Sequence, residues 1–170
     1  MEDITHFLTG VLIQISIFMY FKFPFNILFT MVFAFLSHFL IDALAKITYH
    51  TPEALKGDKF WIIWHIIIYS GSLIILIIFF IPYWLGMLFA KIVDIWDWFI
   101  LRPIQNRKKK KNPESKWMEK YFFHPTIDKI RKKTLFWLPN WNYERKGIIP
   151  EIIIIFFLLV IIMFLIYPFS

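Results

Sequence analysis

The sequence predicts an all-α, polytopic membrane protein with about five transmembrane helices and further amphipathic helices at the membrane surface. Of its 170 residues, 59% are hydrophobic and 21% are aromatic, more apolar surface than a soluble domain of this length can bury. Apolar stretches of about 18 residues or more, long enough to cross a bilayer, recur along the chain. Fourteen of the nineteen Lys and Arg residues lie between Arg102 and Lys146.

Four of the five helices are expected in the first 101 residues, at about 4–21, 26–47, 59–80 and 84–101, and the fifth at about 148–167. Pro82 interrupts the 43-residue apolar stretch 59–101, which is too long for one span. Because proline removes a helix hydrogen bond, we expect a tight turn there. A kinked or re-entrant helix is the alternative. The predicted organisation is a four-helix region at 1–101, a basic amphipathic loop at 102–147 and a C-terminal helix at 148–170.

The distribution of charge predicts the orientation. Lys22 is the single Lys or Arg residue expected on one side of the membrane, and the segment 102–147 carries fourteen on the other. The positive-inside rule therefore predicts a multi-pass protein of the inner or plasma membrane with a cytoplasmic N-terminus. The chain begins with Glu2 and Asp3 and not with a basic stretch, so no cleaved signal peptide is expected.

In the basic segment, aromatic and aliphatic residues alternate with Lys and Arg over residues 116–137. This pattern is typical of amphipathic helices in the headgroup layer. Membrane lipids are therefore the expected partners, since each nearby cation attracts anionic headgroups by about 1 kcal/mol. A basic patch could also bind nucleic acid, but the aromatic residues favour the membrane interface, and no nucleic-acid partner is expected.

Ionisable residues inside the predicted helices mark a candidate site. The alternating direction of the helices brings six of them toward the cytoplasmic side: His6, His38, Asp42, His65, Asp94 and Asp97. A central Asp costs about 2.5–3.5 kcal/mol to insert, so such residues pair or bind a ligand. The chain has no cysteine, which excludes disulfides and thiolate ligands. Imidazole and carboxylate groups remain as candidate ligands for a divalent metal.

Helical spacing supports this set. His38 and Asp42 are four residues apart, and Asp94 and Asp97 are three apart, so each pair shares a helix face. Two neighbouring carboxylates repel unless a cation neutralises them. A metal could do this, although Lys91, one turn before Asp94, is a simpler explanation. The histidines could also be hydrogen-bond partners between helices.

Three other ionisable residues lie outside this set. His50 and His124 could each be a ligand, a proton shuttle or a surface residue, and for His124 the surface position is favoured. Glu151 lies at the start of the last predicted helix, where a carboxylate is favourable without any ligand.

Short motifs resemble a known family. The stretch THFLTG at residues 5–10 is similar to the start of the YdjM-like membrane-bound metal-dependent hydrolases, and SHFLID at 37–42 resembles their Ser-His-x-Leu-x-Asp helix. DIWD at 94–97 is more loosely similar to their Asp-x-Asp element, and their Arg-Gly-x-Thr-His-Ser stretch is missing, with His65 as a candidate substitute. The resemblance covers roughly residues 1–100. It implies a zinc-type metal and hydrolysis of a phosphoester-like or lipid substrate.

The resulting hypothesis is a metal-dependent hydrolase at the cytoplasmic face. The metal would polarise the scissile group and lower the pKa of bound water to about 7, and Asp97 or Asp42 would accept the proton. Two alternatives remain open. A non-enzymatic scaffold would use buried His–Asp pairs to hold helices together. A transporter or proton-relay protein would use the same residues, but few polar residues continue the path: Gln14, Ser16, Ser70 and Ser72.

Overall fold

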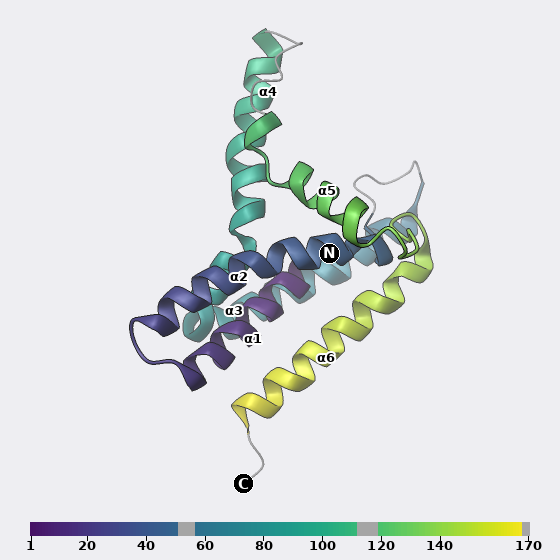
Figure 1. The fold of residues 1–170 in the computed structure, drawn as a ribbon. Coiled ribbons are helices and arrows are strands. Elements are labelled where there is room, and N and C mark those ends of the chain that lie inside the picture. Colours follow the sequence, from purple (N-terminus) through teal and green to yellow (C-terminus); the bar gives the residue numbers. More distant parts are fainter. Residues whose placement is uncertain (51–56, 112–118, 168–170) are drawn as a thin grey trace.

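The computed structural model describes residues 1–50, 57–111 and 119–167, and this part of the chain contains helices and turns but no β-strand. The helices are α1 (Asp3–Tyr20), α2 (Phe25–Leu44), α3 (Lys59–Asp94), α4 (Arg102–Lys111), α5 (His124–Thr134) and α6 (Ile148–Ile166) (Figure 1). A π-helix, Ile95–Leu101, joins α3 to α4. The predicted all-α class is confirmed.

Four helices of the described chain are long and apolar enough to cross a membrane: Asp3–Tyr20, Phe25–Ile47, Lys59–Lys110 and Arg145–Ile166. About five were expected. The difference arises because the helices predicted at 59–80 and 84–101 are counted as one helix, Lys59–Lys110, although the backbone leaves the helical conformation at Tyr83. Parts of two predicted segments, residues 112–118 and 168–170, lie outside the described residues.

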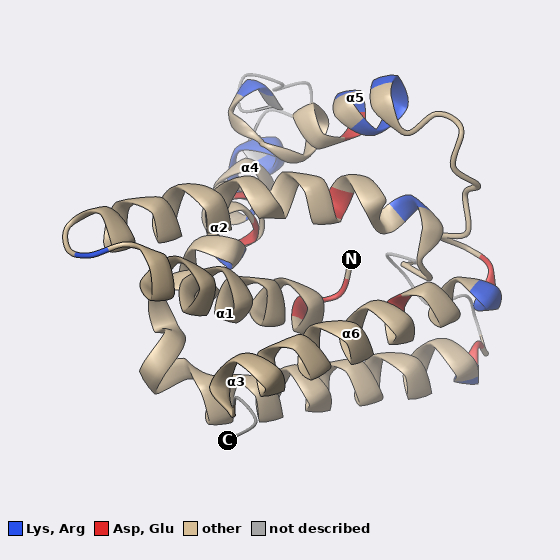
Figure 2. Cartoon of the chain, turned by 60° about the horizontal axis from the view of Figure 1, so that its bottom comes forward, with Lys and Arg blue, Asp and Glu red and all other residues tan. Residues whose placement is uncertain are grey.

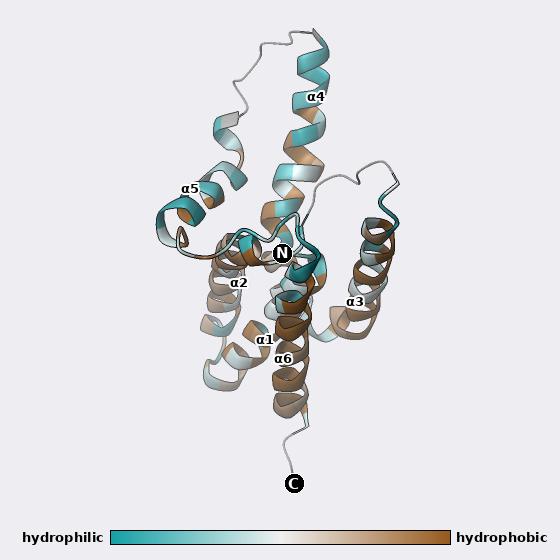
Figure 3. Ribbon diagram, turned by 90° about the vertical axis from the view of Figure 1, so that its right-hand side faces the viewer, coloured by the Kyte–Doolittle hydropathy of each residue, from teal (hydrophilic) through white to brown (hydrophobic). Residues whose placement is uncertain are grey.

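The surfaces of these four helices suit a lipid environment. Ile77 and Ile81, for example, are 70% and 86% exposed, and hydrophobic residues dominate α3 and α6 along their length (Figure 3). Large exposed apolar areas are unfavourable in water and favourable in hydrocarbon. Lys and Arg residues gather instead on α4, α5 and the ends of other helices (Figure 2). The chain is therefore organised as a membrane protein.

The first part of α3 runs parallel to α1. Near the start of α1, the Ile4 side chain lies 3.1 Å from the position of a Cβ on Gly71. Further along α1, Gln14 bonds to the carbonyl oxygen of Pro82. At Tyr83 the backbone leaves the helical conformation, with φ −127° and ψ 23°. The break predicted at Pro82 is therefore present, one residue later at Tyr83.

Beyond the kink the chain runs back along α1. Gly86 lies against Gly10, so close that a Cβ on Gly10 would come within 2.4 Å of the Gly86 carbonyl oxygen. Further on, Lys91 pairs with Asp3 in the first turn of α1. The order of these contacts shows that the direction is reversed. Asp94 is thereby returned to the membrane side where α1 begins.

A single side chain replaces the helix hydrogen bond that is missing at the kink. In a regular helix the Gly86 amide would donate to the Pro82 carbonyl, four residues earlier. Here Gly86 donates to Gln14 Oε1 at 2.8 Å, and Gln14 Nε2 donates to the Pro82 oxygen at 3.2 Å. Gln14 therefore satisfies both backbone groups inside the apolar bundle.

Replacing Gln14 with leucine should destabilise the protein by about 1–3 kcal/mol, because a buried donor and acceptor would lose their partner. The measurement is the free energy of unfolding in detergent micelles. Ser72→Ala is the matched control: Ser72 is also buried, but its hydroxyl has no hydrogen-bond partner in the described chain. Equal stability of the two variants would contradict the role given to Gln14.

The helix α5 lies across the end of α2, whereas α4 points away from the bundle (Figure 1). Ile127 of α5 is buried against Ala43 and Val93. Arg131 of α5 also donates through Nη2 to the backbone oxygen of Asp42 at 2.6 Å. These contacts fix the start of α5 next to the ionisable residues at the end of α2.

Candidate metal centre

Four side chains from three helices each bring one potential metal-ligand atom to within 4.8 Å of the others: His38, Asp42, Asp94 and His124. The α2 helix supplies His38 and Asp42 from neighbouring turns. The reversal within α3 delivers Asp94, and the packing of α5 delivers His124. We call these four residues the metal centre, because two imidazoles and two carboxylates of this arrangement could hold a metal ion.

His38 is fully buried and is oriented by a backbone carbonyl. Its Nδ1 lies 2.7 Å from the oxygen of Ala90, and since a carbonyl only accepts, Nδ1 carries the proton. Nε2 of the neutral ring is then a bare acceptor without a hydrogen-bond partner. It lies 3.1 Å from Asp42 Oδ2 and 3.6 Å from Asp94 Oδ1, which are also acceptors.

His124 is oriented in the same way by a carboxylate. Its Nδ1 lies 2.6 Å from Asp97 Oδ2, and its Nε2 lies 3.4 Å from both Asp42 Oδ2 and Asp94 Oδ1. Burial alone would lower the pKa of His124, but hydrogen bonds with the three carboxylates outweigh it and raise the pKa to about 10. Without metal, His124 therefore carries a second proton, which a metal would have to displace.

The chemistry of these atoms fits a metal ion. Two imidazole nitrogens and two carboxylate oxygens face one another, an arrangement that a bound cation would stabilise. Each imidazole also has its other nitrogen bonded to a carbonyl or a carboxylate. Metal-binding histidines almost always have such a partner, which fixes the tautomer and the ring orientation.

Asp97 was predicted as a metal ligand. In the structure it bonds to Nδ1 of His124, whose Nε2 is the nitrogen that lies near Asp42 and Asp94. It is 1% exposed and accepts three hydrogen bonds, from the backbone amides of Phe123 and His124 and from His124 Nδ1. The carboxylate thus holds the first turn of α5 and aims the ring of His124 at the metal centre.

Asp97→Asn should weaken metal binding about 10–100-fold, as is usual when the partner of a ligating histidine is altered. The amide keeps the size of the side chain but loses the negative charge opposite His124 Nδ1. Zinc titration monitored by calorimetry on the chelator-treated protein would measure the effect. His65→Ala is the control and should bind zinc as the native protein does. Weakened zinc binding by His65→Ala together with unchanged binding by Asp97→Asn would indicate that His65 is a ligand.

His6, also predicted as a ligand, contacts the metal centre from outside. Its Nε2 lies 3.0 Å from Asp42 Oδ1, the oxygen that faces away from His38, and its ring stacks on His38 with centroids 4.3 Å apart. Lys91 pairs with both Asp94 and Asp3, so the predicted pairing with Asp94 is confirmed. These residues orient and neutralise the two carboxylates of the centre.

His65 is placed elsewhere. Its Nδ1 bonds to the Trp61 backbone oxygen at 2.8 Å, and its ring stacks on the Trp61 indole at 3.9 Å between centroids. Gly71, six residues further along α3, is already level with Ile4 at the start of α1, so His65 lies about 9 Å beyond that level along the helix axis. The alternating direction of the helices places the predicted residues on one side of the membrane. It does not bring them next to one another within the bundle.

A surface position was favoured for His124, with a ligand role as one alternative, and the structure places the residue within the metal centre with 29% of its side chain exposed. His50, by contrast, pairs with Glu2 at 3.2 Å with about half of its side chain exposed. Glu151 is fully buried and accepts hydrogen bonds from the Thr5 hydroxyl and the Glu2 amide. His50 and Glu151 thus both contact Glu2, just before α1, and neither belongs to the four residues of the metal centre.

Comparison with protein-family models, with curated proteins and with solved structures gives no match to this chain.

Proposed function

We propose that the protein is a membrane-bound, metal-dependent hydrolase that acts on a phosphoester-like or lipid substrate. The observation that carries the proposal is the convergence of the Nε2 atoms of His38 and His124 on the carboxylate oxygens of Asp42 and Asp94. The resemblance of the segments 5–10 and 37–42 to YdjM-like hydrolases supports the same reading.

Zinc is the proposed metal. Two imidazoles and two carboxylates would supply two nitrogen and two oxygen ligand atoms. Zinc prefers four nitrogen, oxygen or sulfur ligands in tetrahedral arrangement, whereas magnesium and calcium prefer six or more oxygens. When bound, the metal supplies Lewis-acid polarisation of the scissile group and a more acidic water molecule.

The surrounding residues have distinct parts in this proposal. Access is from the side of His124, because His124 and Asp94 are 29% and 15% exposed while His38 is fully buried. Asp42 is the candidate proton acceptor, with Oδ2 directed at the centre and Oδ1 bonded to both His6 and the N-terminal ammonium of Met1. Asp97, given the same role from sequence, already accepts three hydrogen bonds and serves to position His124.

The experiment that tests this function uses the purified protein in detergent micelles. Hydrolysis of bis(4-nitrophenyl) phosphate and of a phospholipid with a fluorescent acyl chain should require metal, cease after treatment with a chelator and return when zinc is added. The His50→Ala variant, altered outside the metal centre, should retain the activity. Metal binding without hydrolysis of either probe would refute the hydrolase assignment.

A scaffold in which the metal joins helices is the second candidate. It is favoured by one observation: four protein ligands can complete a tetrahedral shell, as in structural zinc sites. In that case the chelator would lower the unfolding temperature, and no hydrolysis would be found. The transporter alternative has less support, because Gln14, which would continue the path, is engaged with the backbone of Pro82 and Gly86.

The proposed orientation places the metal centre and the basic helices at the cytoplasmic face, with α4 and α5 near anionic headgroups. Reporter fusions at Lys110 and after Ser170, which itself lies outside the described residues, should therefore report opposite compartments. The reason is that α6 starts beside α1, where Glu151 bonds to Thr5, and runs through the membrane to its other side. Two reporters in one compartment would contradict this topology.

A further inference from the structure

An arginine lies near the open side of the metal centre. His124 is the most exposed of the four residues of the centre, and the ring of Trp98 lies against it, with ring centroids 5.4 Å apart. The guanidinium carbon of Arg102 lies over Trp98, 4.4 Å from the centre of the ring. Arg102 is therefore within about 10 Å of the His124 ring. Both Trp98 and Arg102 are exposed, so a ligand at the centre can reach them.

Aromatic contacts hold this guanidinium group and leave its hydrogen-bond donors available. Besides Trp98, the Phe122 ring lies 5.9 Å from the guanidinium carbon of Arg102. The attraction of a cation to an aromatic ring requires no oxygen acceptor. No carboxylate of the described chain pairs with Arg102. Its planar fork of N–H donors, which matches the oxygens of a phosphate or carboxylate, is therefore free to bind an anion.

Two other Lys or Arg side chains of the described chain contact residues of the metal centre, and both are engaged. Lys91 pairs with two aspartates. Arg131 pairs with Asp128 and donates to a backbone oxygen of α2. Since their charges already have partners, Arg102 is better suited than either to attract an anion that approaches from the open side.

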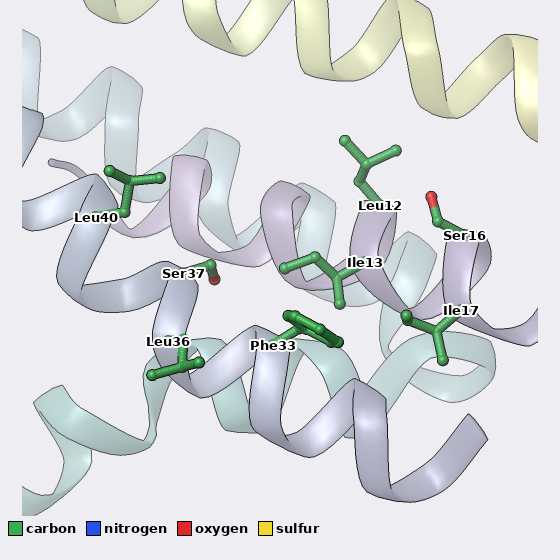
Figure 4. A pocket seen from close by; sticks show the side chains of 8 residues that line it. All are labelled: Leu12, Ile13, Ser16, Ile17, Phe33, Leu36, Ser37 and Leu40. Carbon is green, nitrogen blue, oxygen red and sulfur yellow. The ribbon is translucent and has the colours of Figure 1, made fainter. Parts of the chain in front are cut away.

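The apolar groove between α1 and α2 offers an anion no comparable partner. Its walls include Leu12, Phe33 and Leu40, and each side chain that lines it is apolar or a serine (Figure 4). Burying an ion among apolar groups without a partner of opposite charge is strongly unfavourable. The charged part of an anionic substrate would therefore bind at Arg102 and not in this groove.

We propose that Arg102 binds a phosphate group of the substrate at the open side of the metal centre. This inference rests on the proposed function and narrows its substrate class to molecules that carry a phosphate group, because a neutral ester would leave the guanidinium without an anion. Trp98 and Phe122 position the guanidinium and do not themselves bind the phosphate. A soluble phosphate ester and a phospholipid headgroup carry the same group, and the experiment below distinguishes them.

The test uses the full-length, zinc-loaded protein in dodecyl maltoside micelles and measures the binding of inorganic phosphate by calorimetry. Arg102→Gln, which removes the charge, should weaken this binding about 10–100-fold, the range for loss of a charge-assisted hydrogen bond. Arg102→Lys keeps the charge but not the planar fork of donors, so its affinity should lie between the two. Arg107→Gln, at an exposed position on the same helix, is the matched control and should bind phosphate as the native protein does.

Dioctanoyl phosphatidic acid is the second probe and identifies the source of the phosphate. Binding several-fold tighter than that of inorganic phosphate would indicate a lipid headgroup, and equal binding would indicate a soluble phosphate ester. Arg102→Gln should weaken the binding of both probes.

Zinc content and hydrolysis are measured on the same samples, so the two hypotheses can fail separately. Weakened phosphate binding by Arg102→Gln at native zinc content supports the role of Arg102. If that variant loses zinc, Arg102→Lys takes its place in the comparison. Unchanged phosphate binding, an equal loss in Arg107→Gln, or a native protein that binds zinc but no phosphate would overturn the inference. Phosphate binding that depends on Arg102, without hydrolysis of bis(4-nitrophenyl) phosphate or of the phospholipid, would overturn only the proposed function.

Discussion

Replacing His38 with alanine should abolish metal binding. The native protein is expected to hold about one divalent ion per chain, the stoichiometry of a four-ligand centre, and the variant to hold background amounts. His38 is the most deeply buried of the four residues, and its bare nitrogen lies 3.1 Å from Asp42 Oδ2 and 3.6 Å from Asp94 Oδ1. Elemental analysis of protein purified with added zinc measures the ratio of metal to chain.

The control for this prediction is His50→Ala, which removes a histidine outside the metal centre and should leave the metal content unchanged. Both variants should elute as the native protein does on size exclusion, so that a loss of metal is not mistaken for unfolding. Metal retained by His38→Ala would show that the four residues are not the ligands. A native protein without metal under these conditions would favour hydrogen-bonded His–Asp pairs without an ion.

Replacing Gly10 with alanine should destabilise the bundle by about 3 kcal/mol or more, at the upper end of the range for overpacked sites. The new Cβ would lie 2.4 Å from the oxygen, 2.6 Å from the carbon and 2.8 Å from the next nitrogen of the Gly86 peptide. Backbone atoms cannot move aside as a side chain can, so α1 and the returning part of α3 would have to separate. Such close contacts are a usual basis of helix packing in membranes.

The matched control is Gly71→Ala, where the new Cβ would meet only the flexible end of the Ile4 side chain at 3.1 Å. Its free energy of unfolding in micelles should be close to that of the native protein. If both alanine variants are equally stable, the contact between Gly10 and Gly86 is not what holds the two segments together. A loss of metal content in Gly10→Ala is also expected, since Asp94 lies on the displaced segment.

Three of the four metal-centre residues could be predicted from sequence, because their placement depends mostly on regular helices. The i, i+4 spacing puts His38 and Asp42 on one face, and the reversal at Pro82 brings Asp94 to the same side. His65 was also predicted to lie on this side of the membrane, but it stacks on Trp61 and lies away from the metal centre. Hydrophobic pattern and helix direction determine the side of the membrane, while lateral neighbours depend on tertiary packing.

His124 could not be assigned in this way. It lies 82 residues after Asp42, in a basic segment whose pattern predicts a position in the headgroup layer and no contact with a particular helix. The position of His124 depends on the packing of Ile127 against Ala43 and Val93, and on the hydrogen bonds that Asp97 accepts from His124 and Phe123. The sequence feature that pointed toward His124 was Asp97, a carboxylate in an apolar helix that needs a partner. Its partners are the His124 ring and the backbone amides of Phe123 and His124.

The contribution of α5 to the metal centre has a consequence for biosynthesis. While the chain is being made, α1, α2 and α3 can enter the membrane with His38, Asp42 and Asp94 already present, but the fourth ligand emerges from the ribosome only with residue 124. A metal held by all four residues could therefore bind only after residue 124 has been synthesised. Until then Asp42 and Asp94 would lack His124, whose Nε2 lies 3.4 Å from an oxygen of each, and an aspartate without its partners is costly in a membrane.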